Sequence, residues 1–261
     1  MRKRVIGALS LAIIGIPIFL VGGILFKVLC VILGLLALRE VFNLKESHER
    51  FGAVPMALSI VSLIVLVFLN PSGYALFLGL SYQAIAFTIL SLLIPTIFVN
   101  SYKTKDAIYL MGFTLLLGML FNSVIMLYES NKWVLLYIVL VSMSTDIFAY
   151  LIGSLIGSHK FSKISPNKSI EGCIAGSLCA TIIGTFYYLA VIDGSHVLNI
   201  IILTLIISLV SQMGDIFFSK IKRENGIKDF SKVIVGHGGI LDRLDSLIFA
   251  ILVYIILCTI L

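Results

Sequence analysis

Residues 133–157 read WVLLYIVLVSMSTDIFAYLIGSLIG, a run of 25 residues in which Asp146 is the one charged side chain. A helix needs about 20 consecutive, mainly apolar residues to cross the hydrocarbon core of a bilayer. The run is therefore long and apolar enough to form a membrane-spanning helix, with Asp146 inside it. An ionisable side chain within such a span is costly to insert and usually serves a function.

The composition of the whole chain agrees with this interpretation. Of its 261 residues, 60% are hydrophobic and 12% are charged, and the mean hydropathy is +1.14. Soluble domains are roughly 45–50% apolar and about 25% charged, so the composition excludes an ordinary soluble domain and predicts a polytopic membrane protein. The four cysteines lie in apolar stretches without a C-x-x-C pair, which favours buried thiols over a redox or metal site.

Other apolar stretches predict eight further spans, or nine in all. The nine ranges are 5–20, 24–44, 54–69, 74–99, 107–128, 133–157, 172–193, 197–217 and 244–261. The range 74–99 is long for one helix, and Pro95 predicts a kink near its end. We therefore expect an all-α, polytopic integral membrane protein with about nine transmembrane helices.

The basic residues predict the orientation of these helices. With the N-terminus in the cytoplasm, 16 of the 19 Lys and Arg residues fall in inner segments, and Lys132 alone falls in an outer connector. Positive charge concentrates in cytoplasmic loops, so we expect a cytoplasmic N-terminus. The inner segments 158–171 and 218–243 are too long and polar for simple turns. We thus distinguish N-terminal transmembrane helices, 1–145, from a catalytic region, 146–261, that contains both loops.

Polar residues recur at helical spacing within two spans. In one span they follow positions i, i+4, i+8 and i+11 and so share a face, namely Ser211, Asp215, Ser219 and Lys222. A similar stripe contains Asp146, Tyr150, Gly153 and Gly157, whose glycines permit close approach of another helix or of a ligand. The alternative is that these carboxylates lie close enough to the inner membrane face to reach water.

Residues 219–246 combine cations, glycines and carboxylates. Lys222, Arg223 and Lys228 suit phosphate oxygens, and the glycines of 236–239 let backbone N–H groups surround an anion. Asp242 and Asp245 share a helix face and suit a divalent cation. A polybasic loop at the lipid surface is the alternative, but such a loop has no need of the carboxylates and glycines.

This segment resembles the signature of the bacterial phosphatidate cytidylyltransferase (CDP-diacylglycerol synthase) family. The matching residues are Ser219, Lys222, Arg223, Lys228, Asp229, Ser231, Ile234, His237, Gly238, Gly239, Ile240, Asp242, Arg243, Leu244 and Asp245. Val235 stands where the family usually has Pro or another small turn residue. Residues 146–153, 165–172 and 212–215 resemble further blocks of the same family, the second of them more loosely.

The resemblance implies transfer of a cytidylyl group from CTP to phosphatidate, which gives CDP-diacylglycerol and pyrophosphate. The catalytic residues expected on this basis are Asp215, Asp242, Lys222, Arg223 and Asp245. The substrate-binding residues expected are Ser219, Lys228, Asp229, His237, Gly238, Gly239, Arg243, Asp146, Ser165, Lys168 and Glu171. Asp215 and Asp242 are the expected Mg²⁺ ligands, because the intervening chain is long enough to fold back and because both match acidic positions of the family's metal centre. A second cation is left open.

Other functions remain open at this stage. An ion-coupled transporter would also carry carboxylates inside its spans, although no repeated halves are visible in the sequence. Another membrane lipid phosphotransferase is a second alternative. We expect CTP, phosphatidate and membrane lipid as partners, no nucleic acid, and a site on the cytoplasmic face of the cell inner membrane; the sequence leaves a homodimer open.

Overall fold

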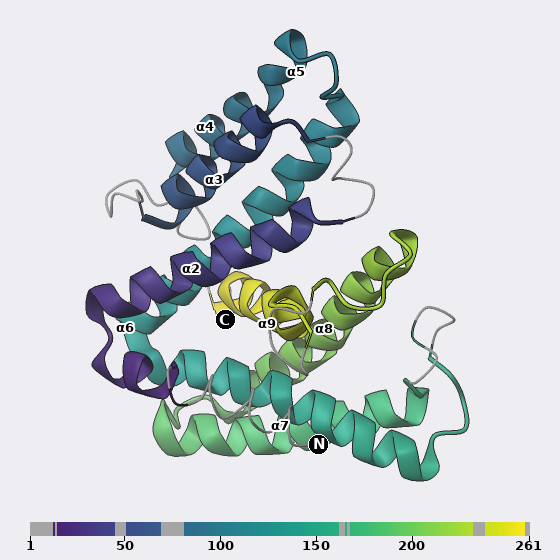
Figure 1. Cartoon of the computed structure of the whole chain (residues 1–261). Coiled ribbons are helices and arrows are strands. Elements are labelled where there is room, and N and C mark those ends of the chain that lie inside the picture. The colour runs from purple at the N-terminus through teal and green to yellow at the C-terminus, as the bar shows by residue number, and fades with distance from the viewer. Residues whose placement is uncertain are drawn as a thin grey trace. The chain divides into compact units, whose positions relative to one another are not determined.

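The computed structural model describes residues 13, 15–44, 51–68, 81–161, 165, 168–231 and 238–258. These residues form eight helices and no multi-residue strand, which confirms the all-α prediction (Figure 1). The helices are α2 (Gly23–Phe42), α3 (Ala53–Phe68), α4 (Tyr82–Leu93), α5 (Pro95–Phe98), α6 (Thr104–Ile156), α7 (Ile170–Val191), α8 (Val197–Glu224) and α9 (Leu241–Cys258).

Local sequence signals decide several helix ends. Gly22 and Gly23 have φ values of 70° and 59°, a region that glycine adopts readily, and they separate α2 from the helical residues before it. Helix α4 begins after Ser81, whose Oγ accepts a hydrogen bond of 3.2 Å from the N–H of Ala84. Pro95 then starts α5. The described part of the expected span 74–99 is therefore two helical pieces that meet at Ile94, directly before Pro95, and the kink expected there stays a prediction.

Helix α6 contains a break where the sequence predicts an outer connector. At Asn131 the backbone is non-helical, with φ −159° and ψ 102°. A straight helix of 53 residues would be about 80 Å long, far more than the roughly 30 Å of a bilayer core. The break thus agrees with separate helical stretches over 107–128 and 133–157.

Three helices, α6, α7 and α8, are long and apolar enough to cross a membrane by length and composition. Helix α3 and the α4–α5 segment are apolar but shorter. Large apolar side chains point outward along these helices, among them Leu155, Phe186 and Leu198. Exposed apolar surface on this scale is typical of contact with lipid, so the chain is described as an all-α membrane protein.

The chain divides into two compact units. The first contains residues 1–126 and 225–242, and the second contains 127–224 and 243–261. In the first unit, α2, α3, α4 and the start of α6 pack together, and Asn122 Nδ2 donates to the Leu66 carbonyl at 3.2 Å. Gly118 faces Leu66 so closely that a Cβ atom would collide with it. The functional division at residue 146 stays a prediction.

Small and hydroxyl side chains hold the second unit together. Gly176 faces Ala149 and the Thr145 carbonyl without room for a Cβ atom, so α7 approaches α6 closely. Hydroxyl pairs join α6 to α8, with Tyr137 to Thr204 and Thr145 to Ser208 both at 2.7 Å. Such pairs replace water as partners for polar groups inside a membrane protein. They fix the helices that carry Asp146 and Asp215.

Candidate active site

Lys168 and Asp215 form an ion pair in the second unit. Lys168 Nζ lies 2.5 Å from Asp215 Oδ2, and the two side chains are 17% and 25% exposed. Burial lowers the pKa of Lys168, but the charges of Asp215 and Asp146 outweigh burial, so the pKa is raised and the ammonium keeps its proton. Apart from this ion pair, the buried Nζ has no hydrogen-bond partner among the residues that the structure describes.

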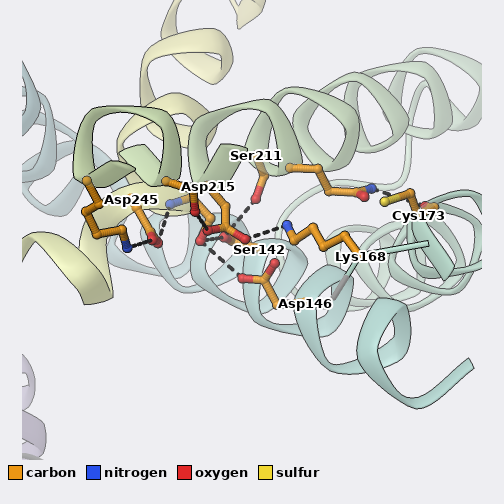
Figure 2. A network of polar contacts seen from close by, with 11 residues as sticks. Ser142, Asp146, Lys168, Cys173, Ser211, Asp215 and Asp245 are labelled. Carbon is orange, nitrogen blue, oxygen red and sulfur yellow. Dashed lines mark hydrogen bonds and ion pairs between the residues drawn. The ribbon is translucent and has the colours of Figure 1, made fainter. Parts of the chain in front are cut away.

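Asp146 is the second carboxylate of this group, and a hydroxyl network positions it. Ser246 Oγ donates to Asp146 Oδ2 at 3.2 Å, and Ser142 Oγ donates to Ser246 Oγ at 3.1 Å. Ser142 and Ser211 are joined at 3.0 Å. The network links α6, α8 and α9, and Figure 2 shows Lys168 extending toward the carboxylates of Asp146 and Asp215.

Asp245 is the third carboxylate, and Lys222 is its cationic partner. Lys222 Nζ lies 4.0 Å from Asp245 Oδ2, and the two side chains are 10% and 13% exposed. The N–H of Ser246 donates to Asp245 Oδ1 at 2.8 Å. Gly214 permits this arrangement, because a Cβ atom there would meet the Asp245 carbonyl and the Phe249 ring. Three carboxylates and two lysines of the second unit therefore gather near one another.

A cavity of about 250 Å³ lies beside the ion pair. Its lining residues are Asp146, Ala149, Tyr150, Ser165, Lys168, Ser169, Cys173 and Asp215. The lining thus combines two carboxylates and an ammonium with apolar surface from α6 and α7. Four of the expected site residues, Asp146, Ser165, Lys168 and Asp215, meet at this cavity.

The loop before α7 presents Lys168 to the cavity. Glu171 Oε1 lies 2.6 Å from His159 Nδ1 and accepts from Ser158 Oγ at 2.8 Å. The N–H of Phe161 donates to the Lys168 carbonyl at 2.9 Å, and Ser169 caps α7 by accepting from the N–H of Gly172. In the structure Glu171 thus closes this loop, and its expected role in binding substrate stays a prediction.

The glycine stripe on α6 serves helix packing. A Cβ atom at Gly153 or Gly157 would collide with the Ser169 side chain, and one at Gly172 would collide with the Ala149 carbonyl. The close approach of a helix, one of the two alternatives predicted for these glycines, is present in the structure, and the approach of a ligand stays a prediction. Gln212, in one of the family blocks, adds a contact between α8 and α7, since its Nε2 donates to the Cys173 carbonyl and to Ser177 Oγ.

In the first unit, Asp242 binds backbone N–H groups on both sides of residues 232–237. Its Oδ2 accepts from the N–H of Phe230 and from the N–H of Gly239, both at 2.9 Å. Gly238 has a φ of +88°, and a Cβ atom there would lie 3.0 Å from the same oxygen. The glycine therefore suits both the backbone conformation and the close approach of the carboxylate.

Glu40 of α2 is another carboxylate of the first unit that binds this segment, and it was not among the residues predicted from the sequence. Its side chain is 1% exposed, and Oε1 accepts from Ser231 Oγ and from the N–H of Ile240, both at 2.7 Å. Oε2 accepts from the N–H of Leu241 at 2.8 Å. The sequence alone could have identified Glu40 as a candidate, because it is a carboxylate within an apolar span, as Asp146 is.

In the structure, backbone N–H groups in and just after the Gly238–Gly239 pair bind protein carboxylates. Of the N–H groups expected to surround a phosphate, that of Gly239 donates to Asp242 in the structure, and the next two along the chain, those of Ile240 and Leu241, donate to Glu40. Their role in substrate binding stays a prediction. His237 lies outside the described residues.

The remaining expected site residues are distributed over α8, α9 and the segment between them. Ser219 Oγ donates to Asp215 Oδ1 at 3.5 Å. Arg223, Lys228, Asp229 and Arg243 are exposed. Asp215 belongs to the second unit and Asp242 to the first, so their pairing at a metal stays a prediction.

The donor chemistry of the site fits Mg²⁺. Among the described residues no three His, Cys, Asp or Glu side chains form a group that could hold a metal ion. Mg²⁺ usually takes only one or two protein carboxylates and completes its shell with water and substrate phosphates, so a cage of three is not required. The carboxylates of Asp146, Asp215 and Asp245, on α6, α8 and α9, supply oxygen donors of the right kind.

Comparison with known proteins gives one consistent result. Residues 2–261 match the model of the cytidylyltransferase family. A phosphatidate cytidylyltransferase of Staphylococcus aureus (strain COL) is 33% identical over 259 residues, which cover 96% of each chain. Proteins of the same name from Staphylococcus epidermidis and Staphylococcus haemolyticus are 30% and 31% identical, again over 96% of each chain.

Proposed function

The chain belongs to the cytidylyltransferase family, and on that premise we propose how it works as a CTP:phosphatidate cytidylyltransferase. The enzyme transfers the cytidylyl group of CTP to phosphatidate in phospholipid biosynthesis. The observation that supports this function at the described site is the ion pair between the buried Nζ of Lys168 and Asp215, at a cavity that Asp146 also lines. Both substrates are phosphate anions, and this ammonium retains N–H donors for an anion.

The reaction needs charge stabilisation more than proton transfer. An oxygen of the phosphatidate phosphate forms a bond to the α-phosphorus of CTP, and the bond from that phosphorus to the β-phosphate oxygen breaks, releasing pyrophosphate. The attacking oxygen is already anionic, so no general base is required. The protein has to bring two anions together and stabilise the charge that develops between them.

The cavity suits one phosphate group and the carbon atoms attached to it. Pockets for drug-sized ligands usually measure roughly 300–1,000 Å³, and this cavity of about 250 Å³ lies below that range. We infer that Lys168 binds a substrate phosphate there, while Ala149, Tyr150 and Cys173 provide apolar contacts. A lipid phosphate with its glycerol carbons matches this mixture of charge and apolar surface.

Carboxylates and further cations complete the proposed site. Asp215 and Asp242 are the proposed Mg²⁺ ligands, with Asp146 and Asp245 as the nearest alternatives. Bound Mg²⁺ neutralises charge on the nucleotide phosphates. Lys222, Arg223 and Lys228 are proposed to contact the CTP phosphates, since charge-assisted hydrogen bonds to phosphate are strong.

The proposed activity is tested directly with the purified protein. In detergent with CTP, phosphatidate and Mg²⁺, the full chain should form CDP-diacylglycerol and pyrophosphate in equal amounts, measured by thin-layer chromatography and a coupled pyrophosphate assay. Omitting phosphatidate is the control that separates transfer from CTP hydrolysis. Solute uptake into vesicles without any CTP-dependent product would instead support the transporter alternative.

The predicted orientation, with nine spans and a cytoplasmic N-terminus, is tested by thiol labelling. After replacement of the four native cysteines, Glu224→Cys at the inner end of α8 and Ser130→Cys next to the break in α6 are both accessible side chains. An impermeant maleimide added to intact cells should label position 130 and spare position 224 until the membrane is opened. Labelling of position 224 from outside would contradict this orientation.

A further inference from the structure

We propose that Glu40 of α2 is a positioning residue for the transfer reaction, holding the N-terminus of α9 together with Ser231 and Ile240 in the arrangement that catalysis requires. The proposal rests on the proposed function. Nothing in the cytidylyl-transfer chemistry itself calls for a carboxylate at this place. The argument comes from the contacts of the Glu40 side chain.

Both oxygens of Glu40 are used within the first unit. Oε1 accepts hydrogen bonds from Ser231 Oγ and the N–H of Ile240, and Oε2 accepts one from the N–H of Leu241. Ser231 precedes residues 232–237, and Ile240 and Leu241 follow them. One buried carboxylate thus joins both ends of that stretch to a helix almost 200 residues away in the chain.

The charge of Glu40 is matched to its partners. Leu241 is the first residue of α9, and a helix N-terminus presents unpaired N–H groups with a partial positive charge. A carboxylate buried to 99% would be very costly without such partners, because burial disfavours the charged form. The three donors and the helix N-terminus stabilise it together.

Glu40 acts next to a second carboxylate with complementary contacts. Asp242 accepts from the N–H groups of Phe230 and Gly239, which are the chain neighbours of the groups that Glu40 binds. The two carboxylates therefore fix adjacent backbone groups on both sides of 232–237. Asp242 lies in the first turn of α9, so its position depends on the helix end that Glu40 holds. Because Asp242 is itself a proposed metal ligand, Glu40 would affect catalysis through it.

Gly239 is the residue that leaves room for this arrangement. A Cβ atom at position 239 would lie 2.6 Å from both carboxylate oxygens of Glu40, and its backbone φ is not in the positive range. An alanine at position 239 would therefore have to displace the Glu40 carboxylate, while the backbone conformation does not oppose it. Substituting Gly239 and Glu40 separately and together therefore tests whether the two residues are in contact.

The first experiment compares Glu40→Gln, Glu40→Asp and the control Glu129→Gln, an identical change at an exposed position. Glutamine keeps the shape, but its NH₂ group faces N–H donors and cannot accept from them. We expect kcat to fall about tenfold or more in Glu40→Gln, because the lost hydrogen bonds are to a charged acceptor. The KM for CTP should change less than threefold, and Glu40→Asp should recover part of kcat.

Amide hydrogen exchange provides a readout that needs no substrate. In the full chain in detergent, peptides covering 226–242 should exchange faster in Glu40→Gln than in the wild type, while peptides from α7 should be unchanged. If the wild type makes no CDP-diacylglycerol, the proposed function fails, but the exchange result still decides whether Glu40 holds this segment. Unchanged exchange and unchanged kcat in Glu40→Gln would overturn the proposal.

The Glu40–Gly239 contact is tested by a double-mutant cycle. Gly239→Ala alone should lower kcat because the new methyl group displaces the carboxylate. Glu40→Ala combined with Gly239→Ala should be no worse than the poorer single variant, since residues in direct contact are not additive. Additive losses would show that the two residues act separately and would contradict the proposal. Ser231→Ala removes one donor and keeps the charge of Glu40, so it should lower kcat only a few-fold. If Ser231→Ala keeps the full wild-type kcat and the Glu40–Gly239 cycle gives additive losses, the positioning role is excluded, even if Glu40→Gln fails to fold.

Discussion

Asp215→Asn should lower kcat by a factor of about 10²–10⁴, because a metal ligand or charge-stabilising group contributes several kcal/mol to the transition state. The substitution keeps the shape of the side chain and removes its charge. Lys168, whose Nζ lies 2.5 Å from Asp215 Oδ2, would lose its ion-pair partner at the cavity. The measurement is kcat at saturating CTP and Mg²⁺ in detergent, with Asp193→Asn, an exposed carboxylate, as the matched control.

A second variant separates catalysis from stability. Removing one member of a fully buried ion pair costs about 3–5 kcal/mol of stability. The cost should be smaller for this partly exposed pair, since Asp146 still compensates part of the Lys168 charge. Combining Asp215→Asn with Lys168→Met should restore the melting temperature but not kcat. A double variant with both restored would mean that the pair is only structural, and near-normal kcat in Asp215→Asn alone would remove Asp215 from the catalytic site.

Asp242→Asn should have the next largest effect, a fall in kcat of about 10²-fold or more. Asp242 Oδ2 accepts from the N–H groups of Phe230 and Gly239, and hydrogen bonds to a charged acceptor are worth about 1.5–3 kcal/mol each. If Asp242 also binds Mg²⁺, as we propose, the Mg²⁺ concentration for half-maximal activity should rise as well. Activity is therefore measured over a Mg²⁺ titration.

The Mg²⁺ titration distinguishes two roles of Asp242. An unchanged half-saturating concentration together with faster amide exchange in 226–242 would limit Asp242 to holding the backbone. In that case Asp245 becomes the next candidate ligand; it already lies beside Lys222 in the second unit. A normal kcat with a normal Mg²⁺ dependence would exclude both roles.

The helical elements could be predicted from the sequence because their signals are local. Apolar runs of the right length predicted α2, α3, α7 and α9 closely, and the polar residues 129–132 predicted the break found at Asn131 in α6. Helix α8 starts at the predicted residue but continues to Glu224, seven residues into the predicted loop 218–243, because hydropathy does not show where a helix with a polar end stops. The stretch 74–99 was predicted less well. Hydropathy shows that residues are apolar, but Ser81 and Pro95 decide where α4 begins and where α5 takes over.

The candidate site was predicted in its residue types more than in its contacts. The stripe containing Asp215 and the isolated carboxylate Asp146 are visible in the sequence, because any charge within an apolar run stands out. The partnership of Lys168 with Asp215 is not visible, since it joins a loop to a helix through the packing of α7 on α8. The role of Glu171 in closing that loop likewise depends on His159 and Ser158.

The sequence by itself determined that this is an all-α membrane protein, and its signature motif indicated a cytidylyltransferase. Both follow from the order of residue types along the chain. Only the tertiary structure decided what the glycines of the signature approach: Gly238 lies against Asp242, and Gly239 lies against Glu40. The physical reason is that a buried carboxylate needs donors from wherever the fold supplies them, and Glu40 finds its donors at Ser231, Ile240 and Leu241, far along the chain.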